Sequence, residues 1–198
     1  MGLNLSKAFP AEIPDTASEA DEESQLVANL RDDPEAFAEL YRRYLNPIYR
    51  YVYLHVGNKA DAEDLTSEVF LRALRKIDTY RHLGYSFSAW LFRIAYHLII
   101  DHRRSRRPAA PIDDLSEGLA DGGEDPLSAF LRDEDNRRLK EHIESLPRLQ
   151  QEALSLRFGG GLKNREIGEV LGKSEATVKM MIHRAVSALK GVMADEKS

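Results

Sequence analysis

Four arginines crowd into five positions near the middle of the chain, after a stretch with apolar residues at helical spacing. Guanidinium groups offer planar donor forks that match phosphate oxygens. The stretch predicts a helix over residues 89–107, which Pro108 ends. Its basic end indicates binding of a polyanion, and a core helix with a solvated basic end is the alternative. The arginines are Arg103, Arg104, Arg106 and Arg107.

Two other groups of residues could also do chemistry. Asp61, Asp64 and Glu68 repeat at i, i+3 and i+7 in a helix predicted from Asp61, forming either a solvated acidic face or a partner-binding one. Residues 78–88 then interrupt the helical pattern with aromatic and cationic side chains. Unpaired bases can stack on such rings while a cation meets phosphate, but the rings could instead pack on the core. This second group comprises Tyr80, Arg81, His82, Tyr85 and Phe87.

Residues 163–190 have the spacing of a helix-turn-helix. Gly168 permits close helix approach, Gly172 makes the turn, and Ser174 caps the second helix. Val178, Met181, Ile182, Ala185 and Leu189 form the apolar side of that helix. The opposite side could present groups to a DNA major groove, although a helical hairpin that binds nothing can share this outline.

The elements that must position these groups are predicted to be helical throughout. Residues 1–20 are expected to be disordered, with a first helix from about Glu22. Asp33-Pro34 predicts the start of a second helix, which Pro47 should bend or weaken and Gly57-Asn58 should end. The apolar stripe of this second helix is Phe37, Leu40, Tyr41, Tyr44, Ile48, Tyr49 and Val52. Residues 127–145 and a short helix after Pro147 precede a turn at residues 158–162.

The composition of the chain excludes several classes of site and indicates how its charge is distributed. The chain has 198 residues, no cysteine and a net charge of −5, so disulfides and thiolate metal sites are excluded. Charge is segregated: residues 34–107 carry +5 and residues 127–198 carry +2, whereas residues 1–33 and 108–126 each carry −6. Two basic modules joined by an acidic tether fit this pattern. No apolar run approaches a membrane span, so membrane insertion is not expected and a cytoplasmic location is the default.

Three segments together resemble a bacterial sigma factor of the extracytoplasmic-function subgroup. They are DAEDLTSEVFLRAL, SAWLFRIAYHLIIDHRRSRR, and LPRLQQEALSLRF followed by REIGEVLGKSEATVKMMIHRA. The resemblance implies binding to core RNA polymerase, through the β′ clamp coiled coil and the β flap, and to promoter DNA, both duplex and single-stranded. It also implies an anti-sigma factor. The chain departs from the family at His97, commonly Asn, at Ser67, often Gln, and at Lys173, usually aliphatic.

The resemblance assigns roles to the residues above. The implied polymerase-binding residues are Asp61, Asp64, Leu65, Glu68 and Phe70. The implied minus-ten residues are Tyr80, Arg81, His82, Tyr85, Phe87, Trp90, Arg93, His97, Arg103, Arg104, Arg106 and Arg107. The implied minus-thirty-five residues are Ser174, Glu175, Ala176, Thr177, Lys179, Met180, His183 and Arg184.

We therefore expect an all-α protein with two small helical domains, residues 21–107 and 127–192, joined by a flexible acidic linker at 108–126 and followed by a tail at 193–198. The second domain is the helix-turn-helix. The expected function is promoter-specific initiation of transcription, and the alternative is a stand-alone helix-turn-helix regulator. No enzyme is expected, since hydrolase, metalloprotease and nucleotide motifs are missing from the sequence. No cofactor or metal is expected.

Overall fold

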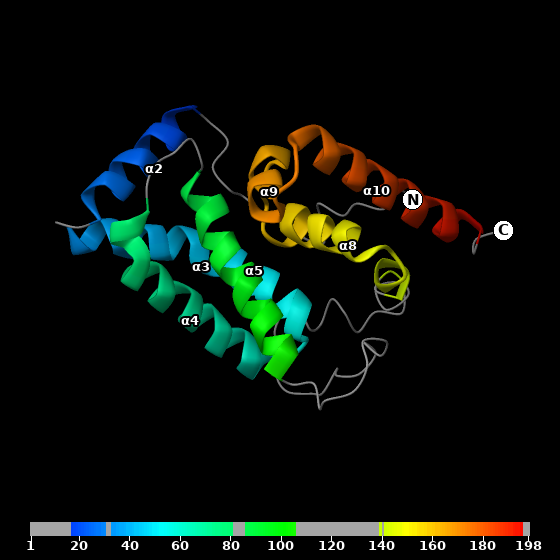
Figure 1. Ribbon diagram of the computed structural model, residues 1–198, viewed down its shortest axis with the longest axis horizontal. Helices are drawn as coiled ribbons and strands as arrows, with labels where there is room; N and C mark the ends of the chain where they lie inside the picture. The colour runs from blue at the N-terminus through cyan, green and yellow to red at the C-terminus, as the bar shows by residue number, and fades with distance from the viewer. Residues whose placement is uncertain (1–16, 31–32, 81–85, 106–138, 140, 196–198) are drawn as a thin grey trace. The chain divides into compact units, whose positions relative to one another are not determined.

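The computed structural model describes residues 17–30, 33–80, 86–105, 139 and 141–195 (Figure 1). These residues form helices and short connections and no strand. The chain divides into two compact units, the first containing α2 to α5 and the second containing α8 to α10. The predicted all-α class with two helical domains is confirmed. The predicted acidic linker at 108–126 lies outside the described residues.

The first unit begins with α2 (Ala17–Asn29), which starts earlier than the predicted helix at Glu22. Helix α2 thus includes residues 17–20 of the segment expected to be disordered, and residues 1–16 lie outside the described part. Two contacts tie α2 to the next helix: Arg43 pairs with Glu22 at 3.1 Å, and the Tyr44 hydroxyl donates to the Glu23 carboxylate.

The second helix of this unit, α3 (Pro34–Val56), has the predicted ends. The Asp33 carboxylate accepts a hydrogen bond from the Glu35 N–H at 2.9 Å, and proline occupies the first helical position. Gly57 ends the helix in the left-handed conformation at φ 73°, where its N–H donates to the Tyr53 carbonyl. The helix continues through Pro47, which has no N–H to donate within it.

The next two helices start two residues before their predicted positions. Helix α4 (Lys59–Lys76) starts before Asp61 because Asn58 caps it, its side chain accepting from the Asp61 N–H at 2.9 Å. A short 3-10 turn, η1 (Ile77–Thr79), follows. Helix α5 (Phe87–Ser105) starts before Ala89 because the Ser86 hydroxyl accepts from the Ala89 N–H at 3.2 Å. Its predicted end at Arg107 lies outside the described residues.

Aromatic rings hold α3, α4 and α5 together, and Figure 1 shows these helices packed side by side. Tyr51 and Phe92 are fully buried with ring centroids 5.3 Å apart, and Tyr44 meets Phe87 at 5.7 Å. Burial lowers the pKa of the neighbouring Arg50 guanidinium. The other fully buried large side chains of this unit include Leu40, Ile48, Val52, Val69, Leu91 and Ile99.

The second unit contains α8 (Arg148–Leu154), the π-helical turn η2 (Ser155–Gly159), α9 (Asn164–Leu171) and α10 (Glu175–Asp195). The turn predicted for residues 158–162 is wrong at its start, because the Gly160 N–H donates to the Ser155 carbonyl and extends the helix by one wide turn. Leu154, Ala185 and Leu189 form one buried cluster with Leu139.

The helix-turn-helix of this unit is confirmed. Gly172 has a φ of 65° and its N–H donates to the Gly168 carbonyl, while the Ser174 hydroxyl accepts from the Thr177 N–H at 3.2 Å. A Cβ placed on Gly168 would lie 2.5 Å from the Lys173 carbonyl oxygen, so α9 approaches the turn before α10 to a distance that only glycine permits.

Gly168→Ala should therefore destabilise the second unit by about 1–3 kcal/mol, because the methyl group meets backbone that must shift. Gly191→Ala is the matched control: Gly191 lies in α10 with nothing within 4 Å of its added Cβ. It should raise stability by about 0.8 kcal/mol. Urea unfolding followed by far-UV circular dichroism measures both changes. Fluorescence of Trp90, the single tryptophan, follows the first unit as an internal reference. Equal stability of the two variants would contradict the close helix contact.

Candidate nucleic-acid interface

The outer face of α5 gathers several of the predicted DNA-binding residues. Trp90, Arg93, His97 and Arg104 recur at i, i+3, i+7 and i+14, so they fall on one side of the helix. Arg93, His97 and Arg104 are exposed and Trp90 is half-buried. Sequence reasoning missed the exposed Asp101 on the same face, one turn after His97. This carboxylate divides the cationic face into two parts.

The arginine cluster does not act as a single group. Arg104 is exposed, whereas Arg103 is half-buried and its guanidinium approaches the His55 carbonyl at the end of α3 at 3.5 Å. A cation at a helix C-terminus complements the negative end of the helix dipole. Arg103 therefore holds two helices together, and Arg104 is the cation that faces solvent. The predicted Arg106 and Arg107 lie outside the described residues.

The predicted aromatic stacking residues form one cluster at the start of α5. Tyr80 lies 5.0 Å from Trp90 and 5.8 Å from Phe87, measured between ring centroids. Phe87 is only 3% exposed and also packs on Tyr44, so it belongs to the core rather than to a base-stacking surface. Tyr80 and Trp90 are half-buried and keep part of their rings accessible. Three further residues predicted for this surface, Arg81, His82 and Tyr85, lie outside the described part.

The acidic stripe of α4 is divided by its contacts. The Asp61 carboxylate accepts from the Asn58 amide at 2.7 Å and lies 3.6 Å from Nε2 of His102 on α5. Glu68 accepts from Nε of Arg72 at 2.7 Å. Asp64, between them, is exposed. Asp61 therefore joins two helices, and Asp64 is the member of the stripe most accessible to a partner.

Apolar side chains lie exposed near the acidic stripe. Leu71 and Leu74 on α4 are both 48% exposed. Tyr41 of α3 is also exposed and packs on Phe70, with ring centroids 4.6 Å apart. Phe70 itself is buried, so it supports this surface from beneath, while the predicted Leu65 is half-buried. A face with exposed leucines beside carboxylates suits a protein partner better than DNA.

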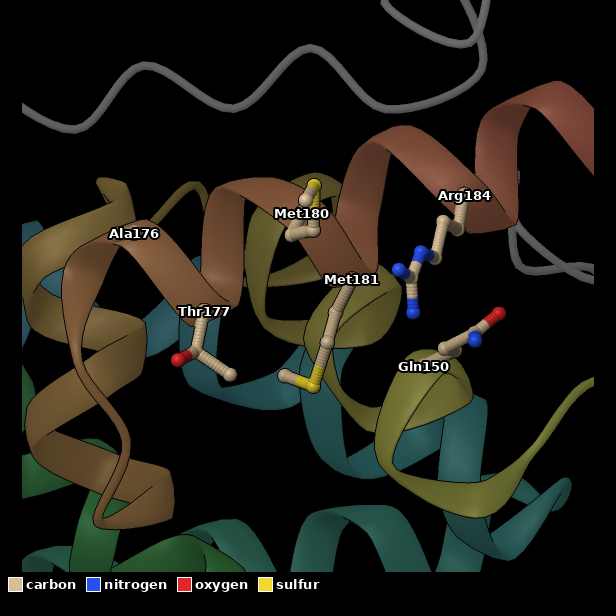
Figure 2. Close-up of a pocket in the computed structure, with 6 residues that line it drawn as sticks. All are labelled: Gln150, Ala176, Thr177, Met180, Met181 and Arg184. Carbon is tan, nitrogen blue, oxygen red and sulfur yellow. The ribbon is translucent and has the colours of Figure 1, made fainter.

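The second helix of the helix-turn-helix presents its predicted face to solvent. All eight predicted residues are exposed, and Val178, Ala185 and Leu189 are buried on the opposite side. A shallow groove of about 320 Å³ runs beside this helix. Figure 2 shows Arg184 of α10 facing Gln150 of α8 at one end of the groove. Sequence reasoning missed Gln150 because it comes from a different helix, 26 or more positions before the others.

Two further findings concern the class of site. Within the ranges given above, no group of three or more His, Asp and Glu side chains is arranged to hold a metal ion. No helix in the described part of the chain is long and apolar enough to cross a membrane.

Comparisons with known proteins place both units in context. Residues 40–109 match the family described as Sigma-70 region 2, and residues 136–189 match Sigma-70, region 4. The chain is 40% identical over 167 residues to the ECF RNA polymerase sigma factor BldN of Streptomyces coelicolor, covering 83% of this chain and 62% of BldN. It is 34% identical over 175 residues to the ECF RNA polymerase sigma factor SigW of Bacillus subtilis, covering 83% of this chain and 92% of SigW.

Two solved structures share the fold. CnrH, in complex with the cytosolic domain of CnrY, has a TM-score of 0.66 at 23% identity, covering 89% of this chain and 99% of CnrH. The sigma factor RpoE of Bartonella quintana, in complex with the anti-sigma factor NepR, has a TM-score of 0.58 at 21% identity, covering 80% of this chain and 96% of RpoE.

The role of Asn58 as the cap of α4 can be tested by substitution. Asn58→Ala removes both the acceptor for the Asp61 N–H and the amide that holds the Asp61 carboxylate. The first unit should lose about 1 kcal/mol of stability, measured by urea unfolding with Trp90 fluorescence. Asn58→Ser should restore most of the loss, because serine is also a good cap. Ser174→Ala, which removes the cap of α10 in the other unit, should leave the Trp90 transition unchanged. An unaffected Trp90 transition in Asn58→Ala would contradict the capping role.

Proposed function

The chain belongs to the sigma-70 family of bacterial RNA polymerase sigma factors, in the extracytoplasmic-function subgroup, and on that premise we propose that it directs promoter-specific initiation of transcription. It binds core RNA polymerase, recognises and melts the minus-ten element with its first unit, and reads the minus-thirty-five element with its second. The observation that carries the proposal is the presence of both Sigma-70 regions in one chain, each with an exposed face suited to its ligand. A stand-alone helix-turn-helix regulator would need only the second of them.

We assign the two promoter elements to two domains of the chain. The minus-ten domain comprises residues 17–107, starting at α2 rather than at residue 21, and the minus-thirty-five domain comprises residues 127–192. Residues 108–126 are the linker between them and residues 193–198 are a tail. The protein acts in the cytoplasm, where RNA polymerase transcribes DNA, and it catalyses no reaction of its own.

The acidic and apolar face of α4 is the docking surface for the β′ clamp coiled coil. Asp64, Leu65 and Glu68 are its charged and apolar contacts, and Asp61 and Phe70 hold the helix from within the fold. The exposed Leu71 and Leu74 add apolar area that a protein partner would remove from water. The second unit meets the β flap.

The outer face of α5 and the adjoining aromatic cluster receive the minus-ten element. Tyr80 and Trp90 stack unpaired bases, Arg93 and His97 lie where base edges pass, and Arg104 holds phosphate. We assign Arg81, His82, Tyr85, Arg106 and Arg107, which lie outside the described residues, to recognition of the same element. The eight exposed residues at the start of α10 contact the major groove of the minus-thirty-five element.

An anti-sigma factor is the third partner. The structural neighbours CnrH and RpoE are each described in complex with a partner, the cytosolic domain of CnrY and the anti-sigma factor NepR. The exposed leucines of α4 offer such a partner a site that overlaps the polymerase-binding face, so the two would compete.

The direct test is co-elution of the purified protein with core RNA polymerase, in the absence of DNA at moderate salt. We expect a stable complex, weakened about tenfold by the double substitution of Asp64 and Glu68 with alanine, because charged side chains across an interface are coupled to their partners. Glu63→Ala is the matched control, since Glu63 is an exposed carboxylate of the same helix outside the stripe. If duplex DNA binds but no complex with core polymerase forms, the stand-alone regulator replaces this proposal.

Arg104→Ala should lower the salt dependence of promoter binding without affecting stability. Loss of one duplex phosphate contact reduces the slope of log K against log salt concentration by about 0.9. Promoter binding of the reconstituted holoenzyme, titrated at several salt concentrations, measures this slope. Arg75→Ala, which removes an exposed arginine from α4 instead, should leave it unchanged. An unaltered slope for Arg104→Ala would remove the phosphate assignment.

A further inference from the structure

Met180 is an apolar side chain in an unusual place. At 55% exposure it is the most exposed large hydrophobic residue of the described part of the chain. It lies in the middle of a face whose other long side chains, Lys179, His183 and Arg184, are polar or cationic. A single exposed apolar side chain is common on protein surfaces, so the meaning of Met180 depends on the side chains that surround it on this face.

Met180 does not stand alone on this face. Ala176 lies one turn before it and is also exposed, and Thr177 adds a methyl group beside them. All three line the groove next to α10, together with Met181, Arg184 and Gln150. In Figure 2, Met181 reaches to the same side as Thr177, while Arg184 and Gln150 close the other end. The groove therefore has an apolar floor, formed by Ala176, Met180 and the methyl group of Thr177, with the hydrogen-bond donors of Arg184 and Gln150 at one edge.

The chemistry of base edges limits what can contact such a floor. In the major groove, guanine, cytosine and adenine present hydrogen-bond donors and acceptors, and thymine adds a 5-methyl group. A thioether or an alanine methyl placed against a donor or acceptor removes water from it without replacing the hydrogen bond, which is unfavourable. Against a thymine methyl group the same side chains gain from apolar contact.

The surroundings of the apolar floor favour DNA over a protein partner. The apolar side chains exposed between Ser174 and Arg184 are only Ala176 and Met180, whereas a protein interface buries roughly 800 Å² on each side. Lys179 and Arg184 flank the floor with cations that complement phosphate. A small apolar spot between cations matches a base edge between two phosphate backbones.

We infer that Met180, with Ala176 and the methyl group of Thr177, reads the 5-methyl groups of one or two thymines in the minus-thirty-five element. This inference rests on the function proposed above and names the base chemistry that its second unit recognises. Side chains one helical turn apart are separated by about 5–6 Å at Cβ, and successive base pairs by about 3.4 Å. Ala176 and Met180 can therefore reach at most two neighbouring base pairs.

The test removes the methyl group from the DNA rather than from the protein. The reconstituted holoenzyme first selects its preferred minus-thirty-five sequence from a randomised library. Each thymine of that sequence is then replaced by deoxyuridine, which lacks only the 5-methyl group. At one or two positions, promoter occupancy by the unsubstituted holoenzyme should fall about fourfold, the ratio expected for one buried methyl group.

Protein variants link this loss to Met180. Met180→Ala should lower occupancy of the thymine promoter about as much, and deoxyuridine should then cause no further loss. Val192→Ala is the control, because Val192 is an exposed apolar residue of the same helix far from the groove, and it should behave as the unsubstituted protein. Both side chains are exposed, so neither substitution threatens the fold, which circular dichroism verifies.

Other outcomes overturn the inference. If no deoxyuridine substitution changes occupancy while the holoenzyme still initiates at the selected promoter, methyl readout is excluded and the proposed function stands. If Met180→Ala lowers occupancy equally on thymine and deoxyuridine promoters, Met180 contacts a protein partner instead. If the chain forms no holoenzyme, the inference and the proposed function fail together.

Discussion

The burial of one face of α5 against α3 and α4 is the constraint on which the first unit depends. Leu91, Ala95, Leu98 and Ile99 recur at helical spacing and are almost completely buried, and the ring of Phe92 meets Tyr51 of α3. A helix has 3.6 residues per turn, so fixing its apolar face also fixes the direction of every other side chain. Arg93, His97 and Arg104 face solvent for this reason, and half-buried Trp90 lies on the same side of the helix. The face proposed to bind DNA is thus a geometric consequence of the core.

Close backbone contact plays the corresponding part in the second unit. Gly168 leaves no room for a Cβ beside the Lys173 carbonyl, and Gly172 turns the chain in a conformation that favours glycine. These two positions set the approach of α9 and α10, and Val178, Ala185 and Leu189 then fix the rotation of α10. Within the recognition face, the hydroxyl groups of Ser174 and Thr177 lie 2.8 Å apart, and the cap that Ser174 forms holds the start of α10. The arrangement of the eight exposed residues comes from the turn and the buried side.

Local patterns in the sequence predicted most of the fold, and failed where tertiary packing decides. The caps at Asp33, Gly57, Gly172 and Ser174 could be predicted because a cap is a property of a few adjacent residues. Asn58 and Ser86 were missed, although both are good capping residues, because the sequence pattern placed Asn58 at the end of the preceding helix and Ser86 in an interruption of the helical pattern. Phe87 looked like a surface ring because it follows a glycine-containing segment, and only its contact with Tyr44 on a distant helix makes it core. Gln150 had no local signal at all, since its place beside Arg184 depends on how α8 packs.

Neighbouring residues with the same charge have different roles in this protein. One member of each pair contacts another helix, and the other is exposed and available to a binding partner. Arg103 approaches the carbonyl end of α3 while Arg104 faces solvent. Asp61 contacts the cap of its own helix and His102 of α5, so it connects α4, proposed to face polymerase, to α5, proposed to face the promoter. Substituting Asp61 or His102 therefore disturbs both surfaces at once, and a loss of polymerase binding in such a variant would not identify a contact. Asp64 is exposed on the same stripe without joining the two helices, so a change there reports on the proposed docking face alone.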